Sequence, residues 1–108
     1  IDGNPRTNKQ LWQAIAEGLG KPDHFREEAR KLTAPGEKKW RDLLNGEQAL
    51  IILDELPLYL DKTKGVQVGA SNLASQTCHA LTNLFACLSK PGTEKCMVLF
   101  ADLNTEYA

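Results

Sequence analysis

The stretch ALIILDE, residues 49–55, constrains the fold of this chain more than any other feature. Its apolar run is too short for a helix of normal length and shows no alternation, which is typical of a strand in a sheet that is covered on both faces. We therefore expect a central, parallel strand over residues 48–53. The carboxylates of Asp54 and Glu55 follow without a turn residue, so they either begin the polar surface or belong to a site.

A second apolar run, residues 96–101, predicts another buried strand. An amphipathic helix precedes it, capped by Ser71 or Asn72 and ended by Pro91-Gly92. The apolar stripe of this helix consists of Leu73, Thr77, Leu81, Leu84 and Leu88. Strand, helix and strand in this order predict two neighbouring parallel strands joined by a crossover. Within the crossover, Pro57 argues against a longer first strand, and residues 62–70 are predicted to form an exposed loop.

Three amphipathic helices are expected before the first strand. A capping box, residues 7–10, precedes the first helix, which Gly20 ends. The second begins after Pro22-Asp23, and the third ends at Asn45-Gly46. Their apolar stripes contain Leu11, Trp12, Ile15 and Leu19, then Phe25, Ala29 and Leu32, and then Trp40, Leu43 and Leu44.

The expected fold class is α/β, in a single partial domain. A helical segment, residues 1–46, precedes a strand-helix-strand unit, residues 47–108. Two strands make a thin sheet with unpaired edges, which is typical of a piece of a larger parallel sheet. The chain begins at Ile1 and its one methionine is Met97, so we expect it to be a fragment of a longer protein.

Composition narrows the function classes. The chain has 108 residues, of which 42% are hydrophobic and 25% charged, with a net charge of -1, as in ordinary soluble proteins. There is no basic patch and so no signature of direct nucleic-acid binding. No apolar run approaches the roughly 20 residues that cross a bilayer, so we expect a cytoplasmic protein without a membrane partner. Cys78, Cys87 and Cys96 form no CxxC pair and are expected to be reduced thiols.

Polar residues follow both predicted strands at their carboxyl ends. Asp54 and Glu55 follow the first strand, and Asp102, Asn104 and Thr105 follow the second. Ligands of open parallel sheets bind beyond this edge, so we expect these side chains in one crevice. Adjacent strand residues point to opposite faces, which lets the two carboxylates take different roles. In nucleoside triphosphatases one such carboxylate holds Mg²⁺ and the other activates the attacking water.

A phosphate-binding loop is missing from the chain. Such a loop would read G-x-x-x-x-G-K-[ST]. The one Gly-Lys pair, Gly20-Lys21, is followed by Pro22, and Ile15 stands at the place of the first glycine. The chain itself is therefore expected to bind nucleotide weakly at best, and we expect the loop to lie upstream of Ile1 in the longer protein.

The stretches LWQAIAEGLG (residues 11–20) and WRDLLNGEQALIILDELPLYL (residues 40–60) resemble a family of predicted AAA-type P-loop ATPases of unknown function. The resemblance covers residues 7–102, and the acidic end of the first strand is similar to a Walker B motif. Members are large bacterial and archaeal proteins, often encoded beside DNA methyltransferases in restriction or phage-defence clusters.

This resemblance implies specific roles. Asp54 would be the magnesium-associated carboxylate and Glu55 the catalytic glutamate of ATP hydrolysis. The segment after Ala101 would carry a sensor residue near the γ-phosphate. Asp102 takes the first place there, whereas Asn104 suits the role better because phosphate repels a carboxylate. The implied cofactors are Mg²⁺ and ATP, and candidate partners are further copies of the chain and DNA-modification proteins.

Two other interpretations stay open. In the first, the chain is a non-catalytic interaction module whose helices and residues 62–70 present a surface to a partner, and the carboxylates are structural. In the second, it is a piece of a receiver-type signalling fold, whose acidic pocket also binds magnesium. A receiver fold begins with a strand, so the helical N-terminal segment counts against it.

Overall fold

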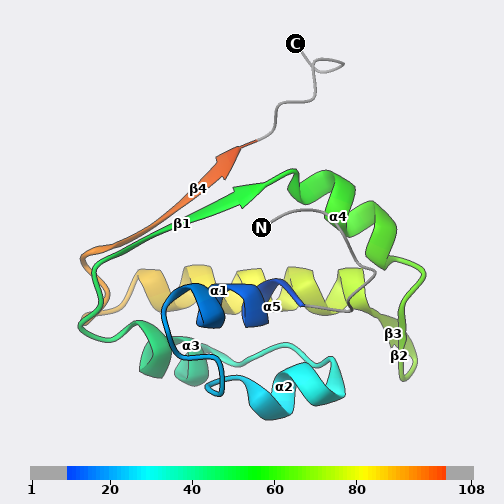
Figure 1. Cartoon of the computed structure of the whole chain (residues 1–108), viewed down its shortest axis with the longest axis horizontal. Helices are drawn as coiled ribbons and strands as arrows, with labels where there is room; N and C mark the ends of the chain where they lie inside the picture. The colour runs from blue at the N-terminus through cyan, green and yellow to red at the C-terminus, as the bar shows by residue number, and fades with distance from the viewer. Residues whose placement is uncertain (1–9, 102–108) are drawn as a thin grey trace.

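A two-stranded parallel sheet organises the computed structural model, which describes residues 10–101 (Figure 1). Strand β1 (Ala49–Asp54) pairs with strand β4 (Cys96–Ala101), in a register that runs from Ala49 opposite Cys96 to Asp54 opposite Ala101. The mixed α/β fold and the parallel pairing are both confirmed. Within the described residues, no helix has the length and apolar character that a bilayer span requires.

Three helices precede the sheet, as predicted: α1 (Leu11–Gly18), α2 (Arg26–Lys31) and α3 (Glu37–Leu44). Trp12, Phe25 and Trp40 are fully buried, and the rings of Phe25 and Trp40 meet edge to face with centroids 5.0 Å apart. The two tryptophans are therefore core residues. The first helix begins at Leu11, and residues 7–9 of the predicted capping box lie outside the described residues.

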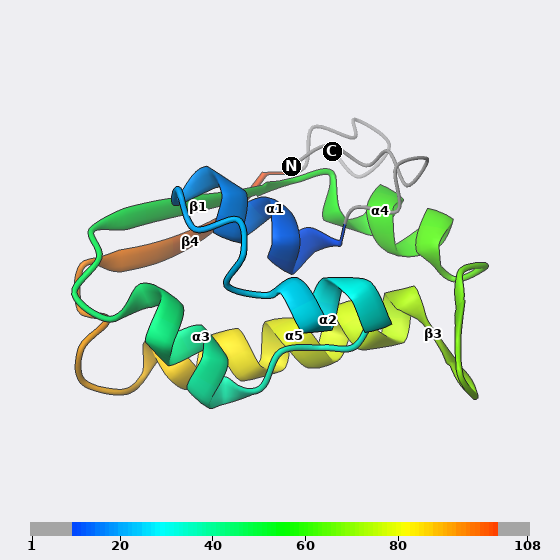
Figure 2. The ribbon, with the colours of Figure 1, turned by 60° about the horizontal axis from the view of Figure 1, so that its bottom comes forward.

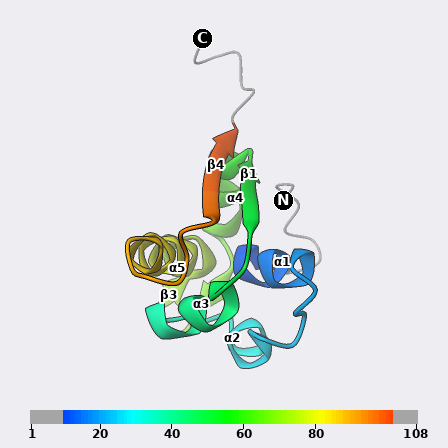
Figure 3. The same ribbon diagram turned by 90° about the vertical axis from the view of Figure 1, so that its left-hand side faces the viewer.

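Four of the helices lie in two layers on one side of the sheet. Helices α1 and α5 (Leu73–Leu88) lie side by side beneath the strands, and α2 and α3 form the layer farthest from the strands (Figure 3). In Figure 2, α2 and α3 lie in front of α5. Helix α5 is central, because it packs against α1, α3 and the helix that follows β1. Asn72 caps it, since its side-chain oxygen accepts a hydrogen bond from the Ser75 N–H at 2.8 Å.

The segment between β1 and α5 differs from the prediction. Residues 56–63 form a helix, α4 (Leu56–Thr63), in which Pro57 lies in the first turn, where a missing N–H leaves no bond unmade. The predicted exposed loop over residues 62–70 contains the end of α4 and strand β2 (Gln67–Val68), which forms a short antiparallel hairpin with β3 (Ser71–Asn72). The crossover thus consists of two helices and a hairpin instead of one helix.

The prediction that β1 is covered on both faces is wrong for the described part of the chain. Ile51 and Leu53 face the helices and are 6% and 1% exposed. The alternating residues are largely exposed, and we call them the bare face: Leu50 (57% exposed), Ile52 (46%), Met97 (64%) and Leu99 (50%). Leu50 and Ile52 also line a hollow with residues at the C-terminal end of α1. The register places Leu50 beside Met97 and Ile52 beside Leu99, so these side chains form one apolar surface.

The two faces of β1 should respond differently to substitution. Leu53→Ala removes a buried side chain and should lower the free energy of unfolding of the 108-residue chain by about 3 kcal/mol. Leu50→Thr alters an exposed position and introduces a residue that favours strands. It should therefore change the free energy of unfolding by less than about 0.5 kcal/mol. Urea unfolding of both variants measures the difference. Equal losses would mean that the bare face is covered in solution.

Candidate functional site

The carboxyl ends of β1 and β4 lie at one edge of the sheet, as predicted (Figure 1). Asp54 ends β1 opposite Ala101, the last residue of β4. Asp102 and Asn104 lie outside the described residues, so their convergence with Asp54 and Glu55 stays a prediction. The structure therefore describes one half of the expected site, the acidic pair after β1.

The side chains of this acidic pair are open to solvent and unengaged. Asp54 and Glu55 are both exposed, and neither carboxylate has a hydrogen bond or an ion pair within the described residues. Asp54 follows Leu50 and Ile52 in the alternation of the strand, so it belongs to the bare face. Two free carboxylates at the ligand-binding edge of a parallel sheet are available to a cation or a water molecule.

Glu55 adopts an unusual backbone conformation. Its φ of 54° and ψ of 39° lie in the left-handed region, which costs an L-residue roughly 1–2 kcal/mol. It forms a corner between β1 and α4, so the expectation that it points to the opposite strand face from Asp54 does not apply. The corner is held by hydrogen bonds from the Glu55 N–H to the Ala101 carbonyl, at 3.0 Å, and from the Tyr59 N–H to the Glu55 carbonyl, at 3.1 Å. Strained residues of this kind cluster at functional sites.

Tyr59 is a residue of this region that the sequence analysis missed. It is 2% exposed, and its hydroxyl oxygen accepts a hydrogen bond from the Leu11 N–H at 3.2 Å. Burial raises the pKa of the Tyr59 hydroxyl, against the lowering effect of the Thr77 side chain and the Leu11 N–H. Tyr59 thus joins α4 to α1. The local signal for it was Pro57, because proline is common in the first turn of a helix, but this signal does not indicate which face of the helix is buried.

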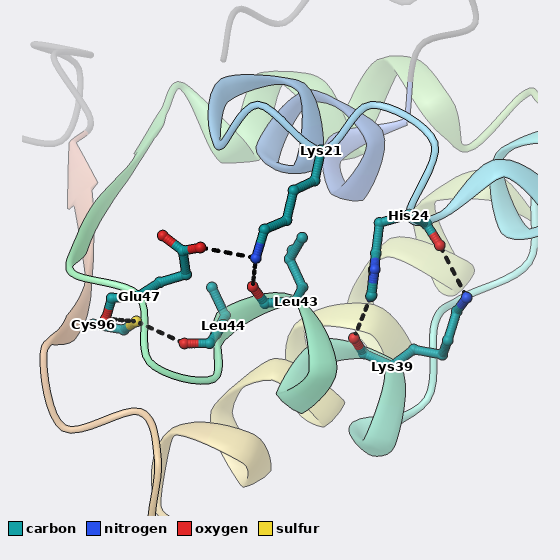
Figure 4. A network of polar contacts seen from close by, with 7 residues as sticks. All are labelled: Lys21, His24, Lys39, Leu43, Leu44, Glu47 and Cys96. Carbon is teal, nitrogen blue, oxygen red and sulfur yellow. Dashed lines mark hydrogen bonds and ion pairs between the residues drawn. The ribbon is translucent and has the colours of Figure 1, made fainter.

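Lys21 is not available to bind phosphate. Its Nζ donates a hydrogen bond to the Leu43 carbonyl at 2.9 Å and forms an ion pair with Glu47 at 2.8 Å (Figure 4). It therefore stabilises the C-terminal end of α3. Gly20 ends α1 with a φ of 76°, as predicted. The structure agrees with the expectation that the Gly20-Lys21 pair is a helix end and not a phosphate loop.

His24 and Lys39 form a second pair of structural contacts in the same region. The His24 Nε2 lies 2.8 Å from the Lys39 carbonyl, and the Lys39 Nζ donates to the His24 carbonyl at 2.9 Å (Figure 4). These contacts join the start of α2 to α3. Like the Lys21 contacts, they hold parts of the helical segment together.

The cysteines are free thiols, as expected. Cys78 is exposed, Cys87 buried and Cys96 partly buried, and burial raises the pKa of the Cys87 and Cys96 thiols. Within residues 10–101, no group of three or more His, Cys, Asp or Glu side chains could hold a metal ion. Mg²⁺ is commonly held by one or two carboxylates, with water and phosphate oxygens as its other ligands. Asp54 and Glu55 offer two carboxylates of the kind that Mg²⁺ uses.

Comparison with known proteins identifies the family. No curated protein and no solved structure matches the chain. The family model described as the DUF499 N-terminal domain matches residues 1–107, a range that includes all described helices and strands. This match extends over nearly the whole chain, and the protein therefore belongs to the DUF499 N-terminal domain family.

Proposed function

We propose that this chain is part of a cytoplasmic AAA-type ATPase domain, in which Asp54 associates with Mg²⁺ and Glu55 orients the water that attacks ATP. The observation that carries this proposal is the corner at Glu55. A free carboxylate is held there in a strained conformation, at the edge of a parallel sheet where ligands bind. A structural turn at this place could use glycine without strain, so the glutamate side chain itself has a use.

The carboxylates of Asp54 and Glu55 are suitable ligands for Mg²⁺, but they do not complete its coordination. Bound Mg²⁺ would supply positive charge to the phosphate oxygens of ATP. Asp54 would hold the ion, directly or through water, and Glu55 would accept a hydrogen bond or a proton from the attacking water. Asp102 and Asn104 stay the candidates for the sensor position after β4.

The phosphates would be bound by residues outside 10–101. The described part contains no glycine-rich phosphate loop, and Lys21 is engaged with Leu43 and Glu47. The proposal therefore requires further polypeptide, and the isolated chain should be inactive. The bare face supports the same requirement, because parallel sheets normally have both faces covered.

A non-catalytic interaction module is the second candidate, and the bare face is the observation that favours it. Exposed apolar surfaces of this kind mark interaction sites. Its partners would be further copies of the chain or DNA-modification proteins, and the carboxylates would be structural. The left-handed conformation of Glu55 counts against this alternative, because glycine would form the same corner without strain.

Glu55→Gln tests the catalytic assignment in the full-length protein. Glutamine keeps the size of the side chain but cannot accept a proton, so we expect ATP turnover to fall about 100-fold or more while ATP stays bound. Steady-state hydrolysis and nucleotide retention on the purified protein measure the two effects.

The matched control is Asp61→Asn, which removes the same charge from α4. Asp61 forms an exposed ion pair with Lys64 at 3.0 Å, and its loss should leave turnover unchanged. Undiminished turnover in Glu55→Gln would rule out the proposed role of Glu55.

The strain at Glu55 gives a separate prediction on stability. Glycine adopts the left-handed conformation without a Cβ clash, whereas alanine keeps the clash. We therefore expect Glu55→Gly to be more stable than Glu55→Ala by about 1 kcal/mol in the 108-residue chain. Chemical unfolding of the two variants measures this difference. A Glu55→Gly variant that is no more stable than Glu55→Ala would show that the corner is not strained in solution.

A further inference from the structure

The left-handed conformation of Glu55 needs support from outside its own sequence. The other described non-glycine residue with a positive φ is Leu32, at the C-terminal end of α2, where this conformation is common. Glu55 instead lies at the N-terminal end of α4, where residues are normally extended. Such a conformation persists only where surrounding contacts enforce it.

Two backbone hydrogen bonds fix the corner, and they differ in what holds them. The bond from the Glu55 N–H to Ala101 continues the pairing of β1 with β4 and is anchored in the sheet. The bond from the Tyr59 N–H to the Glu55 carbonyl is the first turn of α4. The second bond can hold Glu55 only as long as α4 itself is held in place.

Helix α4 is short and is fixed by the Tyr59 side chain. The helix has eight residues and no side-chain cap, and its buried residues are Tyr59 and Thr63. The Thr63 hydroxyl donates to the Tyr59 carbonyl at 2.9 Å and so bonds only within α4 and its backbone. The Tyr59 hydroxyl instead bonds with another element, because it accepts a hydrogen bond from the Leu11 N–H of α1 at 3.2 Å.

The contact with Leu11 serves α1 as well. The first N–H groups of a helix have no partner within it. The side chain of Gln10, which precedes α1, makes no capping hydrogen bond, and the Tyr59 hydroxyl accepts from the first N–H of the helix instead. Losing this hydroxyl would leave a buried donor unpaired, so α1 and α4 are bound to each other at this point.

We propose that Tyr59 is the positioning residue of Glu55: its hydroxyl holds α4 against α1 and thereby keeps Glu55 in the left-handed conformation. The catalytic meaning of this inference rests on the proposed ATPase function. Its structural part rests on the hydrogen bonds alone. The two parts can therefore be tested separately.

Tyr59→Phe tests the structural part in the 108-residue chain. The substitution keeps the ring and removes the hydroxyl. A residue with positive φ gives a strong NOE between its own amide and Hα protons, and we expect Glu55 to lose this signal in Tyr59→Phe. The matched control is Thr63→Val, which removes a buried hydroxyl that bonds only within α4; it should keep the signal.

A signal that persists in Tyr59→Phe, or that disappears in both variants, would overturn the inference. Hydrogen exchange of the unaltered chain decides the question even if Tyr59→Phe does not fold. If the hydroxyl binds α1 to α4, the amides of Leu11 and Tyr59 should exchange through one shared opening and have the same protection. Much faster exchange at Leu11 than at Tyr59 would contradict it.

The catalytic part is tested in the full-length protein. Tyr59→Phe should lower kcat for ATP about tenfold or more with little change in KM, because a displaced Glu55 misaligns the water without altering nucleotide binding. Thr63→Val should leave both constants unchanged. If the unaltered protein does not hydrolyse ATP, the proposed function fails while the NOE still decides the role of Tyr59. A normal kcat in a Tyr59→Phe protein that has lost the NOE would overturn the catalytic part.

Discussion

The parallel pairing of β1 with β4 is the constraint on which the rest of the structure depends. Two parallel strands cannot be joined by a tight turn, so the chain must return along the whole length of the sheet. Helix α4, the hairpin and α5 make this return, and α5 packs beneath the sheet. Because α1 and α3 pack on α5, the N-terminal segment is ordered around the same crossover. The pairing also aligns Asp54 with Ala101 and so creates the edge at which the acidic pair lies.

Much of this fold could be predicted, because helical periodicity and apolar runs report burial directly. Helices α1, α3 and α5 bury residues that their spacing indicated, such as Trp12, Trp40 and Leu84. Helix α2 itself buries none, and of its predicted stripe only Phe25, which precedes the helix, is buried. The helix α4 could not be recognised locally, because Pro57 is equally suited to end a strand and to begin a helix. Tertiary burial of Tyr59 decides between the two. The exposure of one face of β1 could not be predicted from the sequence either. Apolar residues on both faces of a strand do not indicate which polypeptide covers each face.

The acidic pair was visible in the sequence, but its geometry was not. Because the two carboxylates directly follow an apolar strand, the sequence predicts that they lie at the edge of the sheet, and the structure confirms this. Nothing in glutamate favours a positive φ, so no sequence rule could assign that conformation to Glu55. The conformation results from two hydrogen bonds at one residue. The Glu55 N–H continues the strand pairing by donating to the Ala101 carbonyl, and the Glu55 carbonyl begins α4 by accepting from the Tyr59 N–H. The convergence with Asp102 and Asn104 depends on residues outside the described part and stays a prediction.

The bare face and the acidic pair are connected by strand alternation. Asp54 follows Leu50 and Ile52 on the same face of β1, so all three are exposed on one side of the sheet. An apolar element that covered Leu50 and Ile52 would extend along the strand toward Asp54. Its neighbouring backbone and side chains would then be close enough to add ligands beside that carboxylate. If the acidic pair forms the proposed Mg²⁺ site, further polypeptide on this one face would both cover the bare face and complete that site.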